Sequence, residues 1–174
     1  MKEVIAFTGR AGAGKDYQCS LLQPKGYKKL AFADSLREMT SHIIGLDYNE
    51  MMLNYDFYKA NELINGLTLR NVMENLGSSI RQIEPDFFIK ALLKKIIYEK
   101  VCISDLRYVN EFNVLKKWCG ENSYNFKCIF CDYHSPRYQE KNTHESAWLS
   151  NTLCDLGYKD LQEVTEETIW RIQN

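Results

Sequence analysis

The glycine-rich stretch GRAGAGKDY at residues 9–17 constrains the fold most strongly, because it directly follows the apolar run EVIAFT at residues 3–8. Gly9, Gly14 and Lys15 match the pattern GxxxxGK. Glycines at these positions let backbone N–H groups surround phosphate oxygens, and the N-terminus of a following helix adds a favourable dipole. The sequence therefore predicts a strand, a phosphate-binding loop and a helix in this order. A glycine-rich turn without a ligand is the alternative interpretation.

The residue after the loop lysine is an aspartate, Asp16, where such loops usually carry Ser or Thr. The usual hydroxyl places a neutral oxygen on Mg²⁺, and a carboxylate can take that role directly or through a water because Mg²⁺ prefers hard oxygen ligands. The other interpretation is a solvated acidic residue, favoured by the helix dipole at this end. Asp16 is thus a candidate metal ligand with a structural alternative.

Further apolar runs indicate the fold class. KVCIS (100–104) and FKCIFCD (126–132) are near-continuous, as is typical of parallel strands covered on both faces. We also expect a strand in KKLAFAD (28–34) and a weak one in NTLCD (151–155). With helical segments between these runs, the sequence predicts an α/β fold with a parallel β-sheet flanked by helices on both faces. The CIFC motif in residues 128–131 fits a buried strand better than a zinc site.

The clearest helix begins near Thr68 and presents one apolar face, formed by Leu69, Val72, Met73, Leu76, Ile80 and Ile83. A second stripe lies about a quarter turn away at about 100° per residue, and contains Arg70, Glu74, Gly77 and Arg81. GSS at residues 77–79 is the point where this helix would break. We expect further helices after Asp34 acting as an N-cap, after residues 85–86, and over residues 110–119.

Length and composition narrow the function classes. With 174 residues, the chain is expected to form one domain. Lys and Arg number 22 against 23 Asp and Glu, so the net charge of −1 argues against binding to duplex nucleic acid or to an anionic membrane. The N-terminal apolar run is too short for a signal peptide core or a membrane span. We therefore expect a cytoplasmic protein whose six cysteines stay reduced.

Charged residues follow two of the expected strands. Asp105, in SDLRYVNE, comes at the carboxyl end of the run at 100–104, where open parallel sheets bind ligands and where a carboxylate can hold a metal. Arg107 is expected either to contact a substrate or to pair with Asp105 or Glu111. Arg137 lies in the polar segment DYHSPRYQEKNTHES, which is typical of a mobile loop that could close over a transferring phosphoryl group.

The order of several motifs resembles the deoxynucleoside monophosphate kinases of bacteriophages. The matching stretches are GRAGAGKD, FADSLREM, the segment from Lys59 through LTLRNVMENLGSSIRQI to DFFIKAL, and SDLRYVNEF. Phosphomevalonate kinases are similar more distantly, because they share a loop that ends in Lys-Asp. Tyr17 and Phe88 depart from the family pattern, which more usually has a small hydroxyl residue and a tryptophan there. The resemblance covers most of the chain.

The resemblance implies a P-loop kinase fold that uses ATP with Mg²⁺ to phosphorylate a deoxynucleoside monophosphate. It implies ATP binding by Gly9, Arg10, Ala11, Gly12, Ala13, Gly14, Lys15, Asp16 and Tyr17. It implies acceptor binding by Asp34, Arg37, Lys59, Arg70, Arg81 and Asp105. It further implies catalytic roles for Lys15, Asp16, Arg107 and Arg137, and metal binding by Asp16 and Asp105. The acceptor-binding region would span about 34–98 and a lid about 133–146.

Two rival functions and the assembly state stay open at this stage. One rival is a kinase of another phosphorylated metabolite, such as phosphomevalonate; the other is a module that binds or hydrolyses ATP without an acceptor. The aromatic segment YNEMMLNYDFYK at residues 48–59 could stack a nucleobase, which a mevalonate enzyme would not need, or could belong to the core. The location would be the host cytoplasm if the protein is viral, and a homodimer is compatible with the resemblance.

Overall fold

The computed structural model describes residues 1–132, 148–158 and 160–173. The chain forms two compact units, one made of Met1–Ala31 together with Leu93–Asn174, and the other of Phe32–Leu92. The bounds of the expected acceptor-binding region, about 34–98, stay a prediction. The expectation of a single domain stays a prediction.

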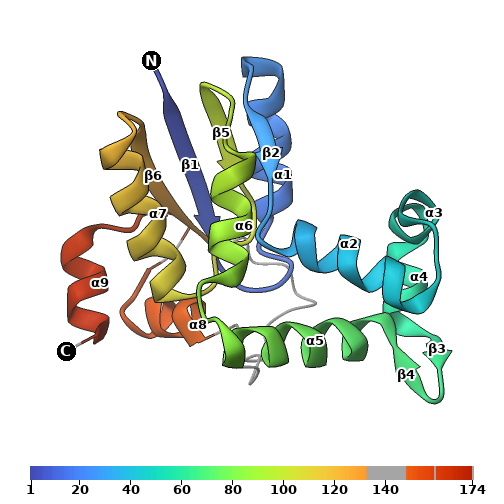
Figure 1. Cartoon of the computed structure of the whole chain (residues 1–174). Helices are drawn as coiled ribbons and strands as arrows, with labels where there is room; N and C mark the ends of the chain where they lie inside the picture. Colours follow the sequence, from blue (N-terminus) through green and yellow to red (C-terminus); the bar gives the residue numbers. More distant parts are fainter. Residues whose placement is uncertain (133–147, 159, 174) are drawn as a thin grey trace. The chain divides into compact units, whose positions relative to one another are not determined.

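A five-stranded sheet organises the first unit, in the order β2-β5-β1-β6-β7 (Figure 1). Its strands are β1 (Glu3–Thr8), β2 (Lys28–Leu30), β5 (Lys100–Ile103), β6 (Asn125–Asp132) and β7 (Asp160–Glu163). All neighbouring pairs are parallel except β6 and β7, which are antiparallel. The expected α/β class is confirmed, and the sheet is mostly parallel, with the antiparallel strand β7 at its edge.

Helices cover both faces of this sheet. Strand residues alternate between the faces, so Ile5 and Phe7 pack toward Cys19 of α1 (Lys15–Leu22). The register pairs Val4 with Phe126, and the ring of Phe126 lies edge-on to Phe112 of α7 (Val109–Glu121), with ring centroids 5.4 Å apart. The sheet is therefore buried on both sides, which explains why its central strands read as continuous apolar runs.

Two expectations about local structure are wrong. Residues 151–155 belong to helix α8 (Trp148–Asp155), not to a strand. The strand that does pair at this edge is β7, with the polar sequence DLQE, and polar edge strands lack the apolar signal on which the prediction relied. Asp34 also does not cap a helix, because α2 (Ala33–Ile44) begins one residue earlier, after Phe32.

The second unit is mainly helical. It contains α2, α3 (Tyr48–Leu53), α4 (Tyr55–Ala60), α5 (Leu69–Ile83) and the first residues of α6 (Phe87–Lys95), which ends in the first unit. Leu36, Met51, Leu69, Met73 and Phe88 form its buried core. Thr68 caps α5 by accepting from the backbone N–H of Asn71, and the helix continues through GSS without a break. Its buried face contains Gly77, whereas Ile83, which was expected in that face, is 86% exposed.

A short hairpin in the second unit was not predicted. Strands β3 (Glu62–Ile64) and β4 (Leu67–Thr68) are antiparallel and are joined by Asn65 and Gly66. Both connecting residues have positive φ angles, 47° and 80°, which is the backbone of a type I′ turn. The Asn-Gly pair between apolar residues was the sequence signal for this turn.

A polar network anchors the amino-terminal edge of the sheet. Glu3 is almost fully buried and accepts hydrogen bonds from the Tyr27 hydroxyl and, at 3.3 Å, from Asn125. Lys127 Nζ lies 3.2 Å from the same carboxylate. The hydrogen bond from Tyr27 is the main cause that lowers the pKa of Glu3 below its ordinary value of 4.5.

In the part of the chain that the structure describes, no helix is long and apolar enough to cross a bilayer.

We expect this network to stabilise the first unit in a pH-dependent way. Because folding lowers the pKa of Glu3, its carboxylate stabilises the folded state above about pH 4.5, and that contribution is lost as the pH falls through the lower folded-state value. Tyr27→Phe should lower the free energy of unfolding at pH 7 by about 1.5–3 kcal/mol, because a hydrogen bond to a charged group is lost. Urea unfolding at pH 7 and pH 3.5 measures both effects. The same loss at both pH values would show that Glu3 ionisation is not involved.

Candidate functional site

The glycine-rich loop at residues 9–14 joins β1 to α1 and takes the shape that only glycine permits at its two ends. Gly9 has a φ of 141°, and a Cβ built on it would lie 2.1 Å from the backbone carbonyl oxygen of Cys131 in β6. Gly14, the N-cap of α1, has a φ of 81° in the left-handed region. A side chain at residue 9 is therefore excluded both by backbone conformation and by the neighbouring strand.

The ammonium group of Lys15 is held against this loop. Its Nζ donates to the carbonyl oxygens of Gly9 and Arg10, each at 2.7 Å. Burial lowers the pKa of Lys15 from 10.5 to about 8, and the nearby Arg107 lowers this pKa further, while Cys131, Asp105 and Asp16 act in the opposite direction. The lysine is thus a cation in a partly dry environment, where its interaction with an added anion is strong.

Asp105 and Arg107 follow β5 and come close to the loop. The backbone N–H of Leu106 donates to the carbonyl of Phe7 at 3.1 Å, which ties this segment to the last residues of β1. Asp105 is 7% exposed, and both charged groups are near enough to shift the pKa of Lys15. The structure therefore brings Lys15, Asp105 and Arg107 together at the carboxyl ends of β1 and β5, the edge where parallel sheets bind ligands.

Glu111 fixes the path of this segment. Its buried carboxylate accepts from the backbone N–H groups of Arg107 at 2.8 Å and Tyr108 at 3.1 Å, at the start of α7. The expectations for Arg107 were a substrate contact or a pair with Asp105 or Glu111, and its backbone N–H does bind Glu111. The glutamate three residues after Tyr108 was the sequence signal for this cap, and the prediction missed its role.

Asp16 lies in the first turn of α1 with its side chain 78% exposed, and it forms an ion pair with Lys29 of β2 at 2.5 Å. Nothing in the sequence pointed to Lys29 as its partner. Its carboxylate and that of Asp105 supply hard oxygens near Lys15, and both raise the Lys15 pKa. Mg²⁺ in nucleotide sites takes one or two carboxylates together with phosphate oxygens, so the donor set present here fits that ion.

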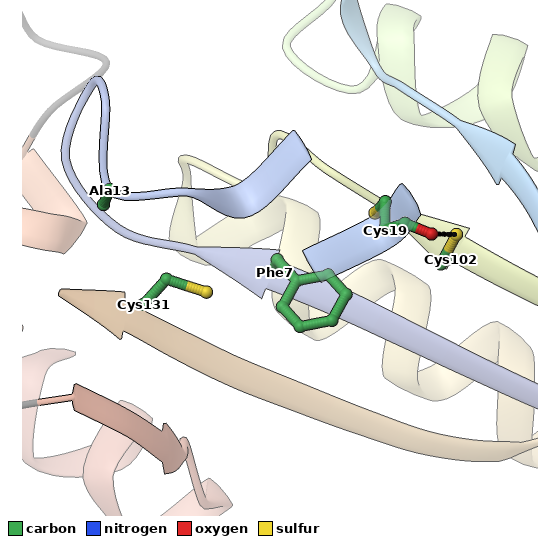
Figure 2. Packing of buried hydrophobic residues seen from close by; sticks show 5 residues of the cluster. All are labelled: Phe7, Ala13, Cys19, Cys102 and Cys131. Carbon is green, nitrogen blue, oxygen red and sulfur yellow. Dashed lines mark hydrogen bonds between the residues drawn. The ribbon is translucent and has the colours of Figure 1, made fainter. Parts of the chain in front are cut away.

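The loop packs on a buried apolar cluster. Ala13 of the loop belongs to one buried cluster with Phe7, Cys19, Cys102 and Cys131, and Figure 2 shows these side chains between the strands and α1. Cys128 and Cys131 are three residues apart on a strand, so their side chains point to opposite faces and cannot share a metal. Burial raises the pKa of Cys128 above its usual range and that of Cys131 to about 11, as expected of reduced thiols. Through Ala13, the loop packs on this apolar cluster.

In the second unit, two of the expected acceptor residues lie over one aromatic ring, and a third pairs with one of them. Arg37 donates to Asp34 Oδ1 at 2.9 Å, and its guanidinium carbon lies 5.6 Å from the ring centroid of Tyr55. Lys59 Nζ lies 5.8 Å from the same centroid. Tyr55 belongs to the aromatic segment at residues 48–59, which is expected either to stack a nucleobase or to belong to the core. Cations already cover its ring, whereas Phe57 in the same segment is 61% exposed.

The other two expected acceptor arginines lie on α5. Arg81 places its guanidinium carbon 4.8 Å from the ring centroid of Phe88. Arg70 forms an exposed ion pair with Glu74 at 3.5 Å. The binding roles of these arginines stay predictions.

Part of the expected site lies outside the described residues. This part contains Arg137, the expected lid at 133–146 and the stretch THES at 143–146, which ends the polar segment that contains Arg137. Among the described residues, no group of three or more His, Cys, Asp and Glu side chains could hold a metal without further ligands.

No family model and no curated protein matches the sequence. Among the solved structures that match is a cysteine-to-alanine mutant of the APS kinase CysC from Mycobacterium tuberculosis. The match covers 89% of this chain and 96% of that chain, with 16% sequence identity and a TM-score of 0.34. A likeness this low does not identify a function.

We expect Gly9→Ala to destroy the loop, because the new methyl group would meet the carbonyl oxygen of Cys131 at 2.1 Å. ATP binding, measured by calorimetry, should be lost, and the free energy of unfolding should fall by about 1–3 kcal/mol or more from backbone strain. Gly120→Ala is the control, because a Cβ there has nothing within 4 Å. Wild-type ATP binding by Gly9→Ala would show that the loop is not the nucleotide site.

Lys15 should make ATP binding depend on proton uptake. At pH 8 about half of the free protein carries a neutral Lys15, since its pKa is about 8. The negative charge of MgATP favours the ammonium form, so binding at this pH should take up about half a proton. Calorimetry in two buffers of different ionisation enthalpy measures the uptake. Lys15→Met should abolish it, and an equal uptake in this variant would assign the proton to another group.

Proposed function

We propose that the protein is a P-loop phosphotransferase that moves the terminal phosphoryl group of ATP to a deoxynucleoside monophosphate. The observation that carries the proposal is the desolvated Lys15 ammonium, bound at 2.7 Å by two carbonyls of a glycine loop at the carboxyl edge of a parallel sheet. This is the arrangement that charge on an outer phosphate requires. ATP phosphates would replace the loop carbonyls, which are neutral acceptors, by partners that carry a full negative charge.

The residues around Lys15 support phosphoryl transfer rather than a covalent intermediate. Such transfer depends on in-line positioning and on neutralising the oxygens of the moving group. Asp16 and Asp105 would hold Mg²⁺, and the ion would offset the charge of the phosphates when it is bound. Lys15 and Arg107 would bind the phosphoryl oxygens, since each affects the electrostatics of the same small region. Arg137 is proposed as the arginine that completes this set.

A monophosphate acceptor explains the basic residues of the second unit. The acceptor in this reaction already carries a phosphate, so cations have to offset the repulsion between two phosphates. Arg37 pairs with Asp34 and lies over Tyr55, and Arg81 lies over Phe88, so these contacts orient each guanidinium before an anion binds. Exposed Phe57 offers an aromatic surface for a base, which favours a nucleotide over a phosphorylated isoprenoid acceptor.

A coupled assay of ADP formation against a panel of ribo- and deoxyribonucleoside monophosphates tests this function. We expect ADP formation to rise at least about tenfold above the rate with ATP alone when the right deoxynucleoside monophosphate is added, because acceptor binding completes the transfer site. Phosphomevalonate in the panel tests the related kinase. ADP formation that no acceptor changes would indicate the ATP-hydrolysing module instead.

Arg70→Ala should raise the acceptor KM by about tenfold and leave the ATP KM unchanged, because one ionic contact is lost on one substrate only. Arg171→Ala is a matched control, since Arg171 forms the same kind of exposed i,i+4 ion pair, with Glu167 on α9 (Glu166–Gln173). Steady-state kinetics with each substrate varied in turn measures both constants. Equal changes in the two KM values would assign Arg70 a structural role.

A further inference from the structure

We propose that Gly77 is a positioning residue for Arg81: its missing side chain leaves the space in which the Arg81 guanidinium lies. The inference rests on the proposed function, in which Arg81 binds the acceptor phosphate. Both residues belong to α5 in the second unit, one helical turn apart. The proposal therefore concerns how this unit shapes its anion-binding surface.

Gly77 is unexpected as an interior helix residue. Glycine is among the least favourable residues in the interior of an α-helix, and Gly77 lies in the buried face of α5. Its φ is not among the positive values found at other glycines of the chain, so the backbone does not require glycine there. The reason for a glycine must then be the space around its Cα.

The neighbours of Gly77 show what uses this space. A Cβ built at residue 77 would lie 3.2 Å from Arg81 Nη1 and 3.2 Å from Leu36 Cδ2, closer than a side chain normally packs. Leu36 is 8% exposed and belongs to the core of the unit. The close atom of Arg81, Nη1, is at the end of a long flexible side chain, whereas Leu36 is confined by close-packed neighbours. An added methyl group would therefore displace the guanidinium more readily than it would displace α2.

The guanidinium of Arg81 has a second defined neighbour. Its carbon lies 4.8 Å from the ring centroid of Phe88, which is 2% exposed and cannot move without disturbing the core. The space over Gly77 and the ring of Phe88 both contribute to where Arg81 presents its N–H groups. Because bidentate binding of a phosphate depends on the orientation of the planar guanidinium, a small displacement weakens that contact.

A purely structural role for Gly77 predicts different behaviour. If the glycine served only to let α2 and α5 approach each other, a methyl group would lower stability and would affect both substrates together. If it positions Arg81, the methyl group would weaken acceptor binding selectively. The helix itself would gain, because alanine favours the helical backbone more than glycine does.

The kinetic test compares Gly77→Ala with Gly120→Ala, a helical glycine with nothing within 4 Å of its built Cβ. We expect Gly77→Ala to raise the acceptor KM by at least about fivefold with an unchanged ATP KM, since a misplaced binding group costs affinity for one substrate. In an Arg81→Ala background the same substitution should have no further effect on acceptor KM, because the two residues act as one unit. An equal rise in both backgrounds would overturn the proposal.

A structural readout keeps the proposal testable if no acceptor is found. The Nε–Hε NMR resonance of Arg81 can be assigned by its absence in Arg81→Ala. Its chemical shift depends on the position of the guanidinium relative to the ring of Phe88. Gly77→Ala should shift this resonance in the same direction as Phe88→Leu. If Gly77→Ala fails to fold, the Leu36→Val background removes one of the two close contacts and allows the same measurement. An unshifted resonance contradicts the positioning role, whereas a shifted resonance without transfer to any monophosphate contradicts only the proposed function.

Discussion

The close approach of Gly9 to the carbonyl of Cys131 is the constraint on which the site in the first unit depends. A Cβ at residue 9 would lie 2.1 Å from that carbonyl oxygen, so the loop can pass this close to β6 only without a side chain at residue 9. From this point the loop turns into α1, and Gly14 begins the helix in the left-handed conformation. Ala13 then packs on the apolar cluster below. The backbone shape that could surround a phosphate is therefore determined by the packing of the sheet and not by the loop alone.

The charged side chains near the loop lie around one partly buried cation, the ammonium group of Lys15. Lys15 donates to two carbonyl oxygens of its own loop, and its ammonium loses enough hydration that its pKa falls to about 8. Asp105 and Arg107 oppose each other in their effect on it. The ion pair of Asp16 with Lys29 is mostly exposed, and such pairs contribute little to stability, about 0–1 kcal/mol. A metal ion could therefore compete for the Asp16 carboxylate at small cost to the fold.

Much of the framework could be predicted because it depends on local signals. The continuous apolar runs of β1, β5 and β6 and the GxxxxGK pattern followed from periodicity and spacing, and α5 followed from its repeating apolar positions. The polar edge strand β7 could not be found this way, since its pairing with β6 is a tertiary contact. The same holds for Lys29 beside Asp16 and for the space that Gly77 leaves for Arg81. Sequence patterns identify the charged residues, whereas their partners depend on which side chains the folded chain brings together.

The proposed reaction transfers the terminal phosphoryl group of ATP to a nucleotide acceptor and not to water. Phosphorus NMR of the protein with MgATP and each deoxynucleoside monophosphate follows every phosphate species in one sample. We expect ADP and one deoxynucleoside diphosphate to grow at equal rates, with little inorganic phosphate. Growth of ADP with an equal amount of inorganic phosphate, and with every monophosphate unchanged, would contradict it.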